Sequence, residues 1–282
     1  MKEKAISIIF TIIGLVAVLF VLLITVYLII AGIPAIGEIG FINFMFGKVW
    51  RSTGSNPEFG ILPFILTSIW GTCGALVIVL PLGFFSSVYL AKMAPKRVRD
   101  LFVVVIGVIS GIPSVVYGLV GMLILVPLIR NIFSLSDGAS LFAAIIVLAI
   151  MILPTVIKVS LTSLEAVPKE YEEASLALGA NETETYFRIS VPAAKSGILT
   201  GVVLGIGRAI GEAMAVMMVA GNVANMPSLF QSVRFLTTAV AIEMSYSSGL
   251  QRQALFSIAL VLFVFIMLIN AILMALREEK DQ

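Results

Sequence analysis

Long apolar stretches separated by short charged ones dominate the pattern of this chain. Runs without a charged residue occupy positions 5–37, 59–91, 101–129, 138–157, 213–233 and 253–276. About 20 apolar residues are enough for a helix to cross the hydrocarbon core of a bilayer, so each run is long enough to span a membrane. We therefore predict an all-α polytopic membrane protein with six transmembrane helices, near 7–32, 62–91, 101–129, 140–160, 196–221 and 254–276.

The composition agrees with this pattern and limits the chemistry open to the chain. Of its 282 residues, 60% are hydrophobic and 12% are charged. It has no histidine, the usual general base and a common zinc ligand, and its single cysteine, Cys73, lies within the second predicted span. The sequence also contains no G-x-x-x-x-G-K phosphate loop. We expect no enzyme activity, no catalytic residue, no metal and no cofactor in this chain, and no nucleic-acid partner.

The basic residues predict an orientation in the membrane. Six spans place both termini on one side, and taking that side as the cytoplasm satisfies the excess of Lys and Arg found inside. The run Lys92–Asp100 is then interpreted as a cytoplasmic anchor that faces anionic lipid. The inside set is Lys2, Lys4, Lys92, Lys96, Arg97, Arg99, Lys158, Lys169, Arg188, Lys195, Arg277 and Lys280, and the outside set is Lys48, Arg51, Arg130, Arg234 and Arg252.

The longest strongly charged stretch, residues 165–195, lies between the fourth and fifth predicted spans. Pro168 suits the first turn of a helix, where its missing N–H is not needed. Glu170, Glu172 and Glu173 place negative charge at the positive end of the helix dipole, and Gly179 is suited to end the helix in a left-handed conformation. We predict a short helix here, either a solvated acidic helix in a loop or a docking element for a partner protein.

The spacing within this stretch resembles the EAA loop of ABC-importer permeases. The shared residues are Glu173-Ala174-Ser175, then Gly179, then Ile189-x-Val191-Pro192. Ser175 stands where that family usually has alanine, and Val191 where it usually has leucine. The resemblance implies a type I ABC importer permease fold, in which this loop docks on a cytoplasmic ATPase and transmits its closure. It implies coupling roles for Glu173, Ala174, Ser175 and Gly179.

The third predicted span is interrupted by a proline. Pro113 cannot donate a backbone hydrogen bond, so we expect the helix to kink or break there. Backbone groups freed within a membrane are tolerated only beside protein or a water-filled cavity. The break is therefore either a packing kink or part of the lining of a translocation path, with Ser114 and Tyr117 as path residues.

The fifth predicted span carries two charged residues, Arg208 and Glu212. Gly197, Gly201 and Gly205 recur every four residues and predict a smooth stripe that faces a neighbouring helix. Arg208 lies roughly 18 Å from the cytoplasmic end of the span, at about 1.5 Å per residue. A charge at that depth costs about 2.5–3.5 kcal/mol or more, which disfavours a lipid-facing position. Either Arg208 and Glu212 pair to lock the helix bundle, or they lie on a transport path.

Three segments resemble the PstC-type permeases of phosphate ABC importers. They are Phe59–Pro63, Gly111–Gly118 and the run Arg208–Val216 followed by Gly221-Asn222. The resemblance covers about residues 59–276. It implies a heterodimer with a PstA-type sister permease, PstB-type ATPase subunits and an extracytoplasmic PstS-type phosphate-binding protein.

Two outer segments have weaker signals. Residues 33–61 contain aromatic side chains, typical of a membrane interface or of contact with an extracytoplasmic partner. Residues 235–246 are apolar but too short to cross the membrane. They predict a short helix. It is either an interfacial or re-entrant helix in which Glu243 contacts a binding protein, or a helix that lies on the lipid surface.

These observations divide the chain into three parts. Residues 1–60 form an N-terminal transmembrane helix and outer aromatic segment, residues 61–276 form the permease domain with a cytoplasmic coupling loop at 161–195, and residues 277–282 form a cytoplasmic tail. We interpret the chain as a multi-pass permease in a prokaryotic cytoplasmic membrane that imports inorganic phosphate. The alternatives are a permease for another oxyanion, such as molybdate or sulfate, and a gradient-driven secondary transporter.

Overall fold

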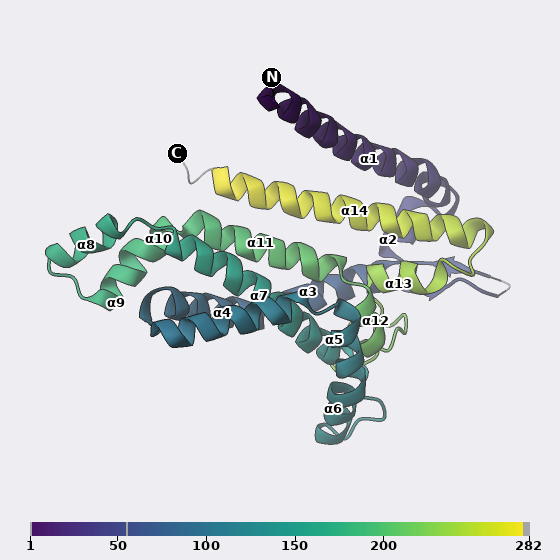
Figure 1. Cartoon of the computed structure of the whole chain (residues 1–282). Helices are drawn as coiled ribbons and strands as arrows, with labels where there is room; N and C mark the ends of the chain where they lie inside the picture. The colour runs from purple at the N-terminus through teal and green to yellow at the C-terminus, as the bar shows by residue number, and fades with distance from the viewer. Residues whose placement is uncertain (1, 55, 279–282) are drawn as a thin grey trace. The chain divides into compact units, whose positions relative to one another are not determined.

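The computed structural model describes residues 2–54 and 56–278, and almost all of the regular structure within them is helical (Figure 1). The side chains of Lys2, Lys4 and Arg277, used above to orient the chain, lie outside the description, as do residues 279–282 of the predicted tail. The chain divides into two compact units. One comprises Met1–Leu62 with Ala239–Phe265, and the other Pro63–Thr238 with Ile266–Gln282.

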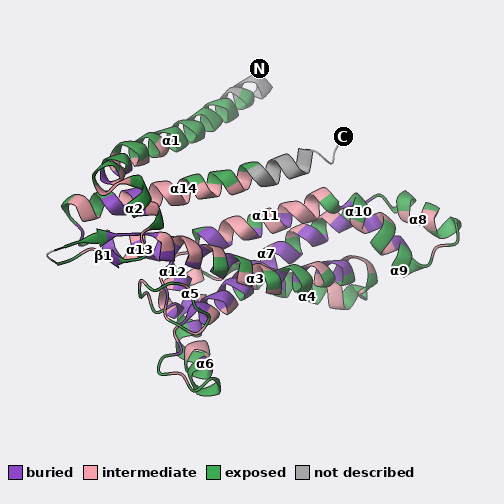
Figure 2. Cartoon of the chain, turned by 180° about the vertical axis from the view of Figure 1, so that it is seen from behind, coloured by how far each residue is buried: buried purple, intermediate pink, exposed green. Residues whose placement is uncertain are grey.

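The first unit joins the N-terminal helix to part of the last one. It contains α1 (Lys2–Ile39), α2 (Phe41–Phe46), a hairpin of β1 (Trp50–Arg51) and β2 (Glu58–Phe59), and the first part of α14 (Gly249–Glu278). Gly32 lets the backbones approach closely, because a Cβ there would lie 3.1 Å from the backbone of Ser257. Most of the described surface of α1 is exposed (Figure 2), as expected for an apolar helix surrounded by lipid.

The second unit is built around α7 (Leu141–Glu165), the most buried of the long helices. Around α7 pack α3 (Leu62–Val88), α4 (Lys96–Gly111), α11 (Lys195–Gly211) and α12 (Met214–Val219). The predicted glycine stripe is confirmed, because added Cβ atoms at Gly197, Gly201 and Gly205 would all meet α7. The small residues thus allow α11 to approach the central helix closely.

Short elements complete the second unit. They are α5 (Ser114–Val120), α6 (Val126–Ile132), α8 (Lys169–Ala177), α9 (Glu182–Thr185), α10 (Val191–Ala193) and the start of α13 (Leu236–Glu243). π-Helical turns lie at Tyr89–Met93, Gly121–Leu125 and Tyr186–Ser190. Such turns occur often at functional sites.

Five helical stretches within the described residues are long and apolar enough to cross a membrane, or six if one bent pair is counted as a span. The bent pair joins Glu182–Ala193 to Lys195–Gly211 at an angle of 68°. Two of the predicted spans are discontinuous. The third is divided at Ile112-Pro113, as its proline predicted, whereas the fifth is divided at Glu212-Ala213, which the prediction of one helix over 196–221 missed.

Candidate functional site

The two helix breaks begin with the same backbone conformation. Ile112 ends α4 with φ −69° and ψ 129°, and Glu212 ends α11 with φ −73° and ψ 127°. In each case a new helix starts two residues later. The residue between is also extended in the first break, where Pro113 has ψ 141°, but not in the second, where Ala213 has ψ −53°. The C-terminal pieces, α5 and α12, then pack on each other. Gly118 is at the contact, because a Cβ there would lie 2.8 Å from the Cα of Ala215.

Arg208 lies half-buried in the last turn of α11, three residues before the helix ends. The C-terminal end of a helix carries partial negative charge, which stabilises a cation at this position. Its Nη1 donates to Thr155 Oγ1 on α7 over 3.1 Å. Among the described residues this is the one side-chain hydrogen bond of the guanidinium, which has five N–H donors. Most of its donors are therefore left for another acceptor.

Glu212 does not pair with Arg208 in this structure. No ion pair joins the two within the described part of the chain. Instead Glu212 Oε1 accepts a hydrogen bond of 3.0 Å from the backbone N–H of Ala215 at the start of α12. Its backbone carbonyl accepts from Thr237 Oγ1 over 2.8 Å. Glu212 thus stabilises the break itself and leaves the positive charge of Arg208 uncompensated by its neighbour.

Ser114 and Tyr117 lie just beyond the other break. Ser114 is the first residue of α5 and is half-buried. The Tyr117 hydroxyl donates to the carbonyl of Ile109 in α4 over 2.6 Å, which ties the two sides of the break together. Tyr117 packs against a core cluster that also contains Ala209, the residue after Arg208. The structure therefore places Tyr117 close to the end of α11.

The predicted helix in the charged stretch is present as α8, and it opens a structured elbow formed by residues 168–185. Pro168 lies one residue before the helix, as its N-cap, rather than in the first turn as expected. Gly179 follows the last turn with φ +91°, so the predicted left-handed end is confirmed. The Ala180 N–H bonds back to the carbonyl of Ser175. Asn181 and Glu184 then cap α9 reciprocally, as a capping box. A backbone hydrogen bond at the end of α8 and a capping box at the start of α9 thus define the turn of the elbow.

The elbow presents an apolar side chain to solvent at its tip. Leu178 is 90% exposed, and α8 contains no buried residue. Glu173 and Ala174 are exposed on α8. Ser175 is half-buried, and its hydroxyl lies 2.9 Å from Thr185 Oγ1 across the elbow. Tyr171 and Leu176 on α8 are also exposed, at 56% and 43%. Several exposed apolar side chains in one short segment favour a surface that binds a partner protein.

Glu172 lies at the base of the elbow and faces inward. Its Oε1 lies 2.5 Å from Lys92 Nζ and accepts a hydrogen bond of 2.7 Å from Ser190 Oγ. Burial raises the pKa of Glu172, but the hydrogen bonds from Lys92 and Ser190 and the charges of Lys92 and Lys169 outweigh it, so that the pKa is lowered overall. The interpretation of Lys92 as a lipid-facing anchor is wrong, because its side chain is only 10% exposed and paired.

Glu243 also lies elsewhere than expected. It is 5% exposed, and its carboxylate accepts hydrogen bonds from Trp50 Nε1 at 3.1 Å and from Gln251 Nε2 at 2.9 Å. The short helix predicted over residues 235–246 is present as α13, but a carboxylate buried within the chain is not a surface contact. Glu243, in α13, instead links the hairpin to α14, because Trp50 in the hairpin and Gln251 in α14 both donate to its carboxylate.

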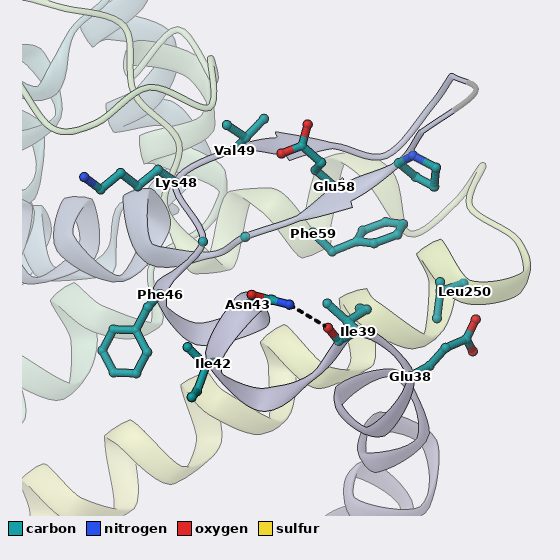
Figure 3. A pocket seen from close by; sticks show the side chains of 13 residues that line it. Glu38, Ile39, Ile42, Asn43, Phe46, Lys48, Val49, Glu58, Phe59 and Leu250 are labelled. Atoms are coloured by element: carbon teal, nitrogen blue, oxygen red, sulfur yellow. Dashed lines mark hydrogen bonds between the residues drawn. The ribbon is translucent and has the colours of Figure 1, made fainter.

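The first unit also contains a cavity of about 600 Å³ between α2, the hairpin and the start of α14 (Figure 3). Glu38, Glu58 and Lys48 are among its lining residues. Two carboxylates against one ammonium make a poor site for an anion. None of the predicted path residues is among those that line it. Within the described residues no group of three or more Asp, Glu, Cys or His side chains is placed to hold a metal ion.

Sequence reasoning missed Thr155 and Thr237, which bond to Arg208 and Glu212, and the partners of Glu172. Thr155 follows Pro154 as a single hydroxyl in an apolar run, a weak signal that a polar contact is present. Lys92 and Ser190 gave no such signal, because each is an ordinary residue in its own segment.

Comparison with known proteins gave consistent results. A family model described as "Binding-protein-dependent transport system inner membrane component" matches residues 79–278. The probable ABC transporter permease protein YqgH of Bacillus subtilis is 38% identical over 256 residues, which cover 88% of this chain and 83% of the relative. The phosphate transport system permease protein PstC of Pasteurella multocida is 33% identical over 268 residues, which cover 86% and 83%.

Two kinds of solved structure share the fold. An inward-facing MetNI methionine ABC transporter aligns with a TM-score of 0.58 at 16% identity, over 78% of this chain and 94% of that chain. An amino acid ABC transporter crystallised with histidines aligns with a TM-score of 0.57 at 20% identity, over 78% and 92%.

Proposed function

Because the chain belongs to the family of binding-protein-dependent transport system inner membrane components, we propose that it carries inorganic phosphate inward as one permease subunit of an ABC importer. Its fold is that of type I ABC importer permeases, and membrane components of this family are not themselves the ATPase. Phosphate as the substrate is supported by PstC relatives that are 33% identical over most of the chain. The proposal depends most on the position of Arg208.

Arg208 combines a permanent charge with unused donors in an apolar segment. A guanidinium presents its N–H groups as a planar fork that matches two oxygens of a phosphate. Glu212 is engaged with α12 and does not neutralise it, and Thr155 takes a single N–H. A positive charge of this kind in a membrane helix favours a position on a substrate pathway over one facing lipid. We assign Arg208 as the phosphate contact, with Glu212, Ser114 and Tyr117 along the same path.

The proposed partners bind at the two ends of the path and beside it. The elbow, with Glu173, Ala174, Ser175 and Gly179, docks on a PstB-type ATPase, and the exposed Leu178 beside them fills an apolar groove of that subunit. A PstA-type permease forms the other half of the translocation path, and a PstS-type protein delivers phosphate from outside. Both termini lie in the cytoplasm of a prokaryote, which places the elbow on the side where ATP is available. No cofactor is bound by this chain.

The test is substrate-dependent ATPase activity and radiolabelled phosphate uptake by the complex reconstituted in liposomes. Each charge-assisted hydrogen bond contributes roughly 1.5–3 kcal/mol. Arg208→Gln should therefore lower uptake at subsaturating phosphate by about 10- to 150-fold, and Arg208→Lys should recover part of it. Arg130→Gln, a change of an exposed arginine on α6, is the matched control.

Two results would overturn the proposal. Full phosphate flux through a stably assembled Arg208→Gln complex would remove Arg208 from the path. Stimulation of the wild-type ATPase by sulfate or molybdate rather than phosphate would assign another oxyanion.

A further inference from the structure

Glu172 joins three segments that are far apart in the sequence. It lies on α8, its carboxylate contacts Lys92 in the turn that follows α3, and the same oxygen accepts from Ser190 in the turn that precedes α10 and α11. All three residues lie within the second compact unit. The base of the elbow is therefore fastened both to the end of α3 and to the segment leading into α11, the helix that carries Arg208.

Both partners of Glu172 lie in π-helical turns. Lys92 is in the turn Tyr89–Met93, and Ser190 is in the turn Tyr186–Ser190. A π turn shifts the register of a helix by one residue, so it re-aims the side chains on either side of it. Here the two shifts direct an ammonium and a hydroxyl at the same carboxylate oxygen.

The contact is sheltered from water. The Lys92 side chain is 10% exposed and the Glu172 side chain is 18% exposed. The ion pair between Arg51 and Glu58, by contrast, has side chains 61% and 51% exposed. A pair of the exposed kind contributes little to stability. In a sheltered pair, removal of one partner leaves the other charge buried and uncompensated, so the three segments are held together firmly.

Neighbouring acidic residues on α8 face different ways. Glu173 is exposed on the surface of the elbow, whereas the adjacent Glu172 reaches inward to Lys92 and Ser190. Successive residues of an α-helix point about 100° apart, which lets one helix contact a partner protein with one acid and the rest of this chain with the next.

We propose that Glu172 is a positioning residue that makes the elbow, the end of α3 and the start of α11 move as one body. Closure of the ATPase on the elbow is then transmitted through Lys92 and Ser190 to the helices of the path. The inference rests on the ATP-driven part of the proposed function and does not depend on phosphate as the substrate.

The experiment measures substrate transported per ATP hydrolysed in the reconstituted complex. Glu172→Gln and Lys92→Gln each remove one charge of the pair. Each should lower this ratio by at least about fivefold, the lower end of the range for coupling between two sites, while the ATPase still co-purifies with the permease. Combining Lys92→Glu with Glu172→Lys restores an ion pair with its charges exchanged, so it should recover much of the ratio.

The matched control is Glu170→Gln, the same chemical change on the same helix at an exposed position. It should leave the ratio unchanged. A wild-type ratio in both single variants would overturn the inference, as would a charge-exchanged pair no better than either single variant. If wild-type ATPase activity responds to no substrate, the proposed function fails instead, so the two failures are distinguishable.

If the single variants do not assemble, a chemical cross-link between positions 92 and 172 provides a second test. Lys92→Cys and Glu172→Cys, in a chain whose Cys73 is replaced by serine, are joined by a short bismaleimide. Segments that move as one body tolerate such a link, so uptake should recover on cross-linking relative to the same uncross-linked variant. Loss of the remaining uptake on cross-linking would show that the segments must separate, and would overturn the proposal.

Discussion

Gly179 offers a sharp test of the elbow because its cost of substitution is purely conformational. Its φ of +91° lies in the region that L side chains rarely adopt, and an added Cβ would meet nothing within 4 Å. Gly179→Ala therefore adds backbone strain of roughly 1–2 kcal/mol without a steric clash. The undocked elbow is free to relax this strain, and docking on the ATPase must restore it, so we expect binding of the ATPase to weaken by about 5- to 30-fold.

The assay is titration of the purified ATPase subunit onto the solubilised permease. Gly179→Asn should be intermediate, because asparagine tolerates the left-handed region better than alanine. Gly14→Ala is the control, since Gly14 is within α1 and also has open space around it. Wild-type affinity in Gly179→Ala, or weaker binding by the asparagine variant than by the alanine variant, would refute the reasoning.

Three further predictions concern stability, each measured by thermal unfolding of the solubilised protein. The pKa of Glu172 is lowered from its ordinary 4.5. The stability that its pair with Lys92 contributes should therefore be complete above about pH 4.5 and be lost as the pH falls through the lower pKa of the folded protein. If the stability advantage of the wild type over Glu172→Gln disappears already between pH 7 and 6, this prediction is contradicted. Gly118→Val should destabilise by about 1–3 kcal/mol through a clash with Ala215, and an unchanged Tm would refute that contact. Glu243→Leu removes the carboxylate that accepts from the buried Trp50 and the half-buried Gln251, and should cost about 1–3 kcal/mol. Glu243→Gln should cost less, and equal losses would contradict the assignment.

The features that sequence reasoning predicted correctly depend on local rules. Apolar length identifies helices able to cross a bilayer whatever surrounds them. Pro113 interrupts a helix because it has no N–H to donate, and Gly179 ends one because it alone adopts a positive φ without strain. The glycine stripe of α11 faces α7 because small residues allow close helix contact. Each conclusion needed only residues within a few turns of one another.

Only the tertiary structure decided the rest, because it depends on which distant residues meet. The break at Glu212 has no proline, and it is stabilised by a contact with Thr237 from another element. The sequence around Glu243 indicated a surface acid, but in the structure its carboxylate is buried against Trp50, 193 residues away. The basic run that contains Lys92 indicated a membrane anchor, but in the structure Lys92 forms an ion pair with Glu172. A charged side chain has the same local pattern in water, in lipid or in an ion pair, and only the packing of the helices selects among these environments.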